Sequence, residues 1–164
     1  MASSPTPLLV AAALGGFAAN SLLCRAALAP DAIDASTFTA LRLLSGAVTL
    51  TLLVRGRGLK TSGSWPAAFA LFIYALAFAL AYRTLTAATG ALLLFATVQL
   101  GMLGAGLWRG ERLLPRQKLG LALALLGLLV LTIPGLKAPD PLSALLMMTA
   151  GAAWAGYSLL GRGK

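Results

Sequence analysis

The stretch "ATGALLLFATVQLGMLGAGL", residues 88–107, contains no charged side chain and decides the fold class. At a rise of about 1.5 Å per residue, a helix of this length spans about 30 Å, the thickness of the hydrocarbon core of a bilayer. Comparable apolar blocks occupy residues 8–24, 37–54, 66–82, 119–134 and 142–160. None alternates apolar and polar residues as the strands of a membrane β-barrel do. The sequence therefore predicts an all-α, polytopic transmembrane bundle with six spans.

The composition supports a membrane protein and excludes several kinds of site. Hydrophobic residues make up 59% of the chain and charged residues 10%, which differs strongly from the average composition of soluble domains. The opening "MASSPTP" lacks the basic segment of a cleaved signal peptide, so we expect residues 8–24 to be a retained helix. One cysteine and no histidine leave no disulfide framework and no His-based site, and we expect no metal and no cofactor. The four acidic residues fall in loops or at span boundaries and form no paired acid/base site, so we do not expect an enzyme.

The basic residues divide unevenly between the two sides of the predicted bundle. With a cytoplasmic N-terminus, nine of the thirteen Lys and Arg residues fall on the cytoplasmic side, as the positive-inside rule requires. The net charge of +9 therefore indicates orientation in a bacterial-type cytoplasmic (inner) membrane and not nucleic-acid binding. The cytoplasmic group is Arg55, Arg57, Lys60, Arg109, Arg112, Arg116, Lys118, Arg162 and Lys164, and the opposite side holds Arg25, Arg83 and Lys137 with Asp31, Asp34 and Asp140.

The last residues of the chain repeat part of its beginning. "GAAWAGYSLLGRGK" at 151–164 aligns with "LGGFAANSLLCRAA" at 14–27, so that Phe17 matches Trp154 and both segments contain "SLL" followed by an arginine. The proline-rich "PGLKAPDP" at 134–141 separates five spans from the sixth. Because five is odd, a second copy would enter the membrane from the opposite side, which is the inverted-repeat organisation of many secondary transporters.

Four successive segments carry a resemblance to a known family. They are "STFTALRLLSGAVTLTLLV" at 36–54, "YALAFALAYRTLTAATGALLLFATVQLGMLGA" at 74–105, "GERLLPRQKLGLALALLGLLVL" at 110–131 and "GAAWAGYSLLGR" at 151–162. In order and spacing the chain resembles the drug/metabolite transporter superfamily, EamA type. The resemblance implies a ten-span protein of two inverted five-span repeats, with cytoplasmic termini, that moves small organic solutes. Residues 1–136 would be the first repeat, and 137–164 a linker and the first helix of a truncated second repeat.

Polar residues inside the spans are the candidates for a substrate cavity, because they are costly in a bilayer. Arg42 lies about one-third of the way through the second span. It could hold a substrate carboxylate or form a gate, or alternatively reach the outer headgroups or pair with a neighbouring helix. Gln99 in the fourth span and Asn20 near the outer end of the first could line a cavity or join helices through hydrogen bonds.

Aromatic and small residues add further expectations. Tyr74, Trp154 and Tyr157 could form a cavity wall or pack in the core. Ser36, together with Asp34, is interpreted as the N-cap of the second span.

The segment "GMLGAGLWRG" at 101–110 places Gly101 and Ala105, then Gly106 and Gly110, at a spacing that lets helices approach closely. Glu111, among arginines, is expected to fix the following loop electrostatically and not to bind substrate.

The sequence thus predicts a secondary transporter of small organic metabolites, with the solute, the lipid bilayer and either the missing second repeat or a second copy as partners. Two alternatives remain. One is a membrane fragment or assembly subunit that does not transport. The other is an oligomeric exporter of the small-multidrug type, which should carry a carboxylate in its first span, whereas residues 8–24 contain none.

Overall fold

The computed structural model describes residues 6–29, 33–54, 63–132 and 139–161. These residues form helices and no strand, as the six apolar blocks predict. Four of the helices, α1, α2, α4 and α6, are long and apolar enough to cross a membrane, and α3 is a shorter apolar helix. The basic linker at 55–62, most of the expected repeat boundary (133–138) and Arg162 and Lys164 lie outside the described residues. The helices are α1 Thr6–Leu28, α2 Ala35–Val54, α3 Trp65–Ala81, α4 Ala87–Trp108, α5 Pro115–Thr132 and α6 Pro141–Gly161.

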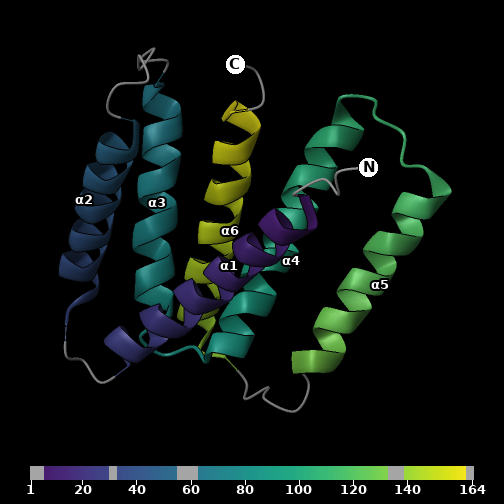
Figure 1. Cartoon of the computed structure of the whole chain (residues 1–164). Coiled ribbons are helices and arrows are strands. Elements are labelled where there is room, and N and C mark those ends of the chain that lie inside the picture. Colours follow the sequence, from purple (N-terminus) through teal and green to yellow (C-terminus); the bar gives the residue numbers. More distant parts are fainter. Residues whose placement is uncertain (1–5, 30–32, 55–62, 133–138, 162–164) are drawn as a thin grey trace.

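The helices run alternately up and down through the bundle (Figure 1). The odd-numbered helices therefore run in one direction, and the even-numbered helices run in the other. As a result α1 and α6, which contain the two aligned segments of the internal repeat, run in opposite directions. This is the relative direction that two copies of an inverted repeat require.

Two helix starts at the same end of the bundle are capped by aspartates. Asp34 accepts hydrogen bonds from the backbone N–H groups of Ser36 and Thr37, at 2.9 and 3.0 Å. The N-cap of α2 is therefore Asp34, and the expectation that Ser36 shares this role is wrong, because its own N–H is one of the groups being capped. Asp140 caps α6 in the same way by accepting from the backbone N–H and the hydroxyl of Ser143, each at 2.9 Å.

The end of α4 is closed by a backbone motif and not by charge pairing. Gly110 has a positive φ of 82°, a conformation that glycine adopts without strain. Its N–H bonds to the carbonyl of Leu107 at 3.0 Å, and the N–H of Glu111 bonds to the carbonyl of Gly106 at 3.0 Å, which together form a Schellman motif. Within the described residues no ion pair is formed by Glu111, so the expectation of an electrostatically fixed loop is not met. Its carboxylate instead lies over Gly106.

Helix α6 is the centre of the bundle and packs on both α3 and α4. Its crossing with α4 is so close that a Cβ atom added at Gly151 would lie 2.7 Å from Cβ of Thr97 and 2.9 Å from the carbonyl oxygen of Leu94. A Cβ at Gly101 would lie 3.1 Å from that of Ala155. The predicted close approach therefore occurs at Gly101, whereas Gly106 and Gly110 serve the end of α4.

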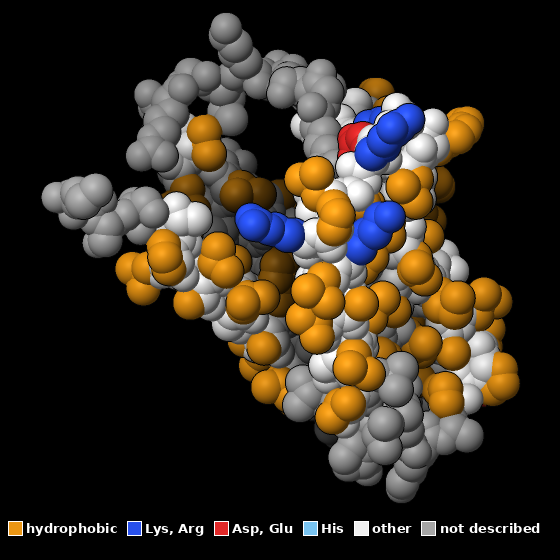
Figure 2. Space-filling model, turned by 90° about the vertical axis from the view of Figure 1, so that its right-hand side faces the viewer, with side chains coloured by type: hydrophobic (Ala, Val, Ile, Leu, Met, Phe, Trp, Pro, Cys, Tyr) orange, Lys and Arg blue, Asp and Glu red, His pale blue; other side chains and the backbone are white. Residues whose placement is uncertain are grey.

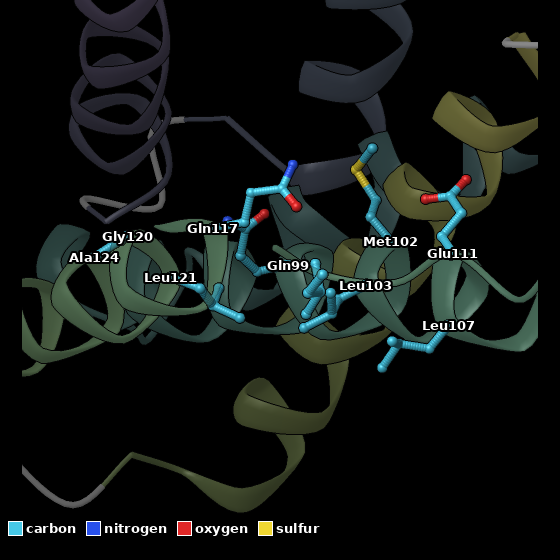
Figure 3. A pocket seen from close by; sticks show the side chains of 11 residues that line it. Gln99, Met102, Leu103, Leu107, Glu111, Gln117, Gly120, Leu121 and Ala124 are labelled. Carbon is cyan, nitrogen blue, oxygen red and sulfur yellow. The ribbon is translucent and has the colours of Figure 1, made fainter. Parts of the chain in front are cut away.

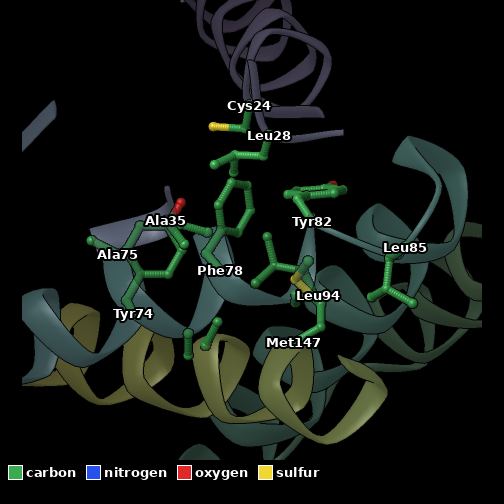
Figure 4. Packing of buried hydrophobic residues seen from close by; sticks show 14 residues of the cluster. Cys24, Leu28, Ala35, Tyr74, Ala75, Phe78, Tyr82, Leu85, Leu94 and Met147 are labelled. Atoms are coloured by element: carbon green, nitrogen blue, oxygen red, sulfur yellow. The ribbon is translucent and has the colours of Figure 1, made fainter. Parts of the chain in front are cut away.

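The buried residues gather toward one end of the bundle. Figure 4 shows the core there, with Phe78 and Tyr82 of the α3 end between Leu28 of α1 and Met147 of α6. Among the described residues, α1 has none buried before Ser21, α2 none after Thr39, and α4 none after Leu94. The opposite ends of these helices are therefore not packed against one another.

Arg25 joins α1 to this packed end. The sequence places it in a loop, but α1 continues to Leu28 and includes Arg25 in its last turn. Its Nη1 donates hydrogen bonds to the carbonyl oxygens of Tyr82 and Arg83, at 3.0 and 2.9 Å. These bonds satisfy carbonyls at the end of α3 and give the charge of Arg25 hydrogen-bond partners.

Most of the remaining surface is apolar. In each of the four candidate spans, at most 22% of the residues in the most apolar part are buried within the bundle. Figure 2 shows a face covered largely by hydrophobic side chains, with the visible Lys and Arg gathered in its upper half. A surface of this size without polar cover fits a lipid environment or a further protein segment.

Candidate functional site

A cavity of about 590 Å³ lies between α1, α2, α3 and α6. Its volume is within the range usual for sites that bind small molecules. Four of the six residues singled out from the sequence line it, namely Asn20, Arg42, Tyr74 and Trp154. The other lining residues are apolar or glycine: Ala13, Gly16, Phe17, Leu43, Gly46, Ala47, Leu50, Leu71 and Ala75.

Arg42 points from α2 toward α1 and α3. Its Nη1 donates to Sγ of Cys24 at 3.8 Å, and its Nη2 donates to the hydroxyl of Tyr74 at 3.4 Å. Its Cζ lies 5.6 Å from the ring centroid of Tyr74 and 5.2 Å from that of Phe78, close enough for cation–π attraction. Of the alternatives drawn from the sequence, the side chain both pairs with neighbouring helices and lines the cavity.

Aromatic rings form one wall of the cavity. The rings of Tyr74 and Trp154 have centroids 4.7 Å apart, and Phe17 meets Trp154 edge-to-face at 6.3 Å. Tyr74 also contacts Phe78 of the core at 5.4 Å. The packing and cavity roles considered for Tyr74 and Trp154 are therefore combined in the same side chains, which stack on the core and face the cavity.

Asn20 supplies the polar group on the α1 side. Its carbonyl oxygen accepts a long hydrogen bond from the thiol of Cys24, at 3.9 Å within the same helix. No bond from Asn20 to another helix is present among the described residues, so the role in joining helices that the sequence left open is not seen. Asn20, Cys24, Arg42 and Tyr74 thus form one short polar chain across α1, α2 and α3.

Gln99 and Tyr157 lie elsewhere. Gln99 is exposed in a groove of about 400 Å³ whose labelled side chains come from α4, α5 and the turn between them (Figure 3). That groove also contains the polar side chains of Glu111 and Gln117. Tyr157 packs on Trp154, with centroids 5.6 Å apart, and lines a recess near the start of α3. The structure therefore does not bring these two residues to the cavity of Arg42.

The sequence analysis missed the apolar part of the lining, although a signal for it exists. On α1 the lining residues are Ala13, Gly16, Phe17 and Asn20, and on α2 they are Leu43, Gly46, Ala47 and Leu50. Both sets have the spacing i, i+3, i+4, i+7, which is one face of a helix. Projection of the first span on a helical wheel from Asn20 would have identified the α1 set, whereas Arg42 lies at the edge of the α2 face.

The packed end of the bundle closes one end of this region. There the hydroxyl of Thr84 donates to the hydroxyl of Ser143 at 2.6 Å, which links the α3–α4 turn to α6. The bonds of Arg25 link the same turn to α1. Two of the four helices that line the cavity are therefore held to the α3–α4 turn at this end.

The chain resembles a longer bacterial protein. It is 55% identical over 161 residues to the Pseudomonas aeruginosa protein that carries the name "Uncharacterized protein PA1977". The match covers 96% of this chain but 56% of that relative, so the chain spans little more than half the length of the relative. No family model matches the chain, and no solved structure matches it.

The polar groups of the cavity can bind a solute. They are the guanidinium of Arg42, the carboxamide of Asn20, the phenol of Tyr74 and the indole N–H of Trp154. No carboxylate of the described residues lines it. The arrangement can orient and hold a solute through hydrogen bonds, charge and ring contacts, with one face set by α6.

Proposed function

We infer that the chain is the first five-helix repeat, with the opening helix of the second repeat, of an EamA-type transporter of the drug/metabolite transporter superfamily. The whole protein would move small organic metabolites across a bacterial inner membrane, with the N-terminus in the cytoplasm. The observation that carries this proposal is the cavity around Arg42, which is lined by α1, α2 and α3 of the first repeat and by Trp154 of α6. In inverted-repeat transporters the substrate site lies where the two repeats meet.

The contact between α1 and α6 supports an inverted repeat. Phe17 and Trp154 are aligned positions of the internal repeat, and their rings touch at 6.3 Å across two helices that run in opposite directions. In an inverted repeat, aligned residues that contact each other would lie beside the two-fold axis. The cavity is lined by both residues and would then adjoin this axis.

The length of the relative is also consistent with a second repeat. A protein of which this chain covers 56% has room for the further helices that a ten-span architecture needs. Those helices would cover part of the apolar surface that α1, α2 and α6 leave exposed. In this two-repeat architecture, residues 1–136 would form the first repeat, and residues 137–164 would form the linker and the first helix of the second repeat.

Two other functions remain as alternatives. A non-transporting membrane subunit would use the apolar faces for assembly and would not need a cavity with a charged residue. An exporter of the small-multidrug type would work as an oligomer of this chain, but α1 carries no carboxylate.

Reconstitution of the chain and of its longer P. aeruginosa relative, in separate proteoliposomes, tests the proposal. Against a panel of radiolabelled metabolites, the relative should show saturable flux of at least one solute. The 164-residue chain alone should show none, because the remaining wall of its cavity comes from the missing repeat. Comparable flux by this chain alone would favour an oligomeric small transporter, and absence of flux by both would favour an assembly subunit.

A further inference from the structure

Among the residues that the structure describes, the charge of Arg42 has no acidic counterpart in its surroundings. Its partners are a thiol, a phenol and two aromatic faces. Within the part of the chain that the structure describes, no ion pair includes Arg42, and the described acids Asp34, Glu111 and Asp140 lie outside the helices. Arg42 is half-buried, and a cation partly withdrawn from water is stabilised when an anion accompanies it. The cavity therefore favours a ligand that brings a negative charge.

The hydrogen-bonding capacity of Arg42 points to the same ligand. A guanidinium has five N–H donors in a planar fork, and the structure records two hydrogen bonds from Arg42, at 3.8 and 3.4 Å. Both are longer than strong charge-assisted bonds and leave donors for a two-pronged contact with a carboxylate. The amide of Asn20, on the α1 wall of the same cavity, adds a neutral donor.

The rest of the cavity suits an uncharged body. Phe17, Tyr74 and Trp154 offer ring faces and edges, and Leu43, Leu50 and Leu71 offer aliphatic surface. Gly16 and Gly46 leave open space on α1 and α2, since a Cβ added at either would meet no atom within 4 Å. A flat ring or a short aliphatic chain would gain both burial and ring stacking here.

We propose that this cavity binds organic monocarboxylates, with the carboxylate on Arg42 and an aromatic or aliphatic body against Phe17, Tyr74 and Trp154. The inference rests on the proposed function only for the location of the site. It also predicts an order among related ligands. A carboxylate should bind better than its neutral amide, and better than the corresponding amino acid, because no carboxylate among the lining residues would pair with an ammonium group.

Trp154 provides a direct readout of binding. The chain has three tryptophans, and replacement of Trp65 and Trp108 by phenylalanine leaves Trp154 as the only indole. Both replaced residues lie at helix ends and are over 90% exposed, at 91% and 93%, so the bundle should tolerate their loss. In nanodiscs, phenylpropionate, phenylpropionamide and phenylalanine are titrated while Trp154 fluorescence is measured.

We expect phenylpropionate to bind saturably, and the amide to bind about ten- to hundredfold more weakly, as loss of a charge-assisted hydrogen bond implies. The amino acid should also bind more weakly, because its ammonium group would be desolvated without a carboxylate partner among the lining residues. Arg42→Gln should abolish the preference for the acid, and Arg42→Lys should retain part of it. Arg116→Gln removes the same charge from exposed Arg116 and should leave the preference unchanged.

In the form that retains Arg42, equal binding of acid and amide would overturn the inference, and so would tighter binding of the amino acid. This test requires no variant at position 42. Persistence of the preference in Arg42→Gln would also overturn it. The outcome is separable from that of the transport assay. If the acid binds but the longer relative shows no flux, the transport proposal is rejected and the carboxylate site is retained. If the relative shows flux but carboxylates are not preferred, the carboxylate site is rejected and the transport proposal is retained.

Discussion

At the scale of single residues, the close crossing of α4 and α6 depends on the absence of a side chain. Gly151 lies against Thr97 and the backbone of Leu94, and neither neighbour is the flexible end of a long side chain. Gly156, further along the same helix, has no atom within 4 Å of the position that a Cβ would occupy. The two glycines therefore have opposite relations to their surroundings, although both lie in α6 and in the same sequence motif.

Gly151→Ala should destabilise the bundle by about 1–3 kcal/mol, the usual cost of overpacking a close contact. Gly156→Ala should be neutral or stabilising by up to about 1 kcal/mol, since alanine has the higher helix propensity. Thermal unfolding of the two variants in the same detergent, followed by circular dichroism, measures the difference. Equal midpoints would show that the crossing of α4 and α6 relaxes to admit a methyl group.

The cap of α6 makes its first turn sensitive to acid. The backbone and hydroxyl hydrogen bonds from Ser143 lower the pKa of Asp140 from its ordinary value of 3.8. Because the pKa is lower in the folded state, the contribution of the cap is complete above pH 3.8 and is lost as the pH falls through the folded-state value. The bond between Thr84 and Ser143 depends on the same turn.

We therefore expect the amide resonance of Ser143 to shift, and its exchange protection to fall, as the pH is lowered below 3.8. Asp140→Asn keeps a capping oxygen but does not titrate, and should show neither change. Nuclear magnetic resonance of a selectively labelled chain at several pH values provides the measurement. An identical titration in Asp140→Asn would assign the effect to another group.

The sequence identified the polar half of the candidate site and not the apolar half. Asn20 and Arg42 were found because polar groups stand out in an apolar span. Phe17 could have been found from its spacing of three residues to Asn20 on the same helix face. Leu43 could not, since it lies to one side of Arg42 on a helix that is apolar on every side. Gln99 is equally polar but lies in the groove with α5, which shows that polarity alone does not assign a residue to one cavity.

At the scale of elements, the helices differ in how firmly they are held. Helix α6 is packed on two sides by α3 and α4, whereas α1 has few buried residues and these lie in its last turns. Arg25 therefore supplies a large share of the attachment of α1. Cys24, which is only 2% exposed and is the single cysteine of the chain, reports on that attachment.

Arg25→Gln should loosen the end of α1 from the α3–α4 turn, because it removes two charge-assisted bonds to carbonyl oxygens. The expected result is alkylation of Cys24 by N-ethylmaleimide at a rate about tenfold higher or more, since the bonds lost are worth roughly 1.5–3 kcal/mol each. Arg109→Gln, at the other end of the bundle, is the matched control and should leave the rate unchanged. Equal rates in the two variants would mean that apolar packing alone holds α1.

Helix positions followed from the sequence because length and apolarity determine them in a membrane protein. The main difference is at Arg25, which an analysis based on hydropathy places beyond the helix. Arginine is a good helix former and is favoured in the last turn. Its bonds to carbonyls of the α3–α4 turn are a long-range contact that no local pattern reveals. The tight α4–α6 crossing at Gly151 was not expected for the same reason, since its partner Thr97 is far away in the sequence.

At the scale of the whole molecule, the distribution of titratable groups bears on how transport would be driven. The chain has no histidine and four acids. Asp34 and Asp140 precede α2 and α6, Glu111 follows α4, and Asp31 lies outside the described residues. A proton-coupled transporter usually needs a titratable residue at depth in the membrane. No acid among the described residues lies inside a helix.

We therefore expect transport by a form with both repeats to be driven by the solute gradient, through facilitated diffusion or exchange. Uptake into proteoliposomes should continue when an imposed pH gradient is collapsed by an ionophore, because the first repeat contributes no proton relay. A control with the solute gradient removed should show no net uptake. Uptake that stops when the pH gradient is collapsed would instead place a coupling carboxylate in the second repeat. The cavity of Arg42 would then bind the substrate, and the second repeat would carry the proton.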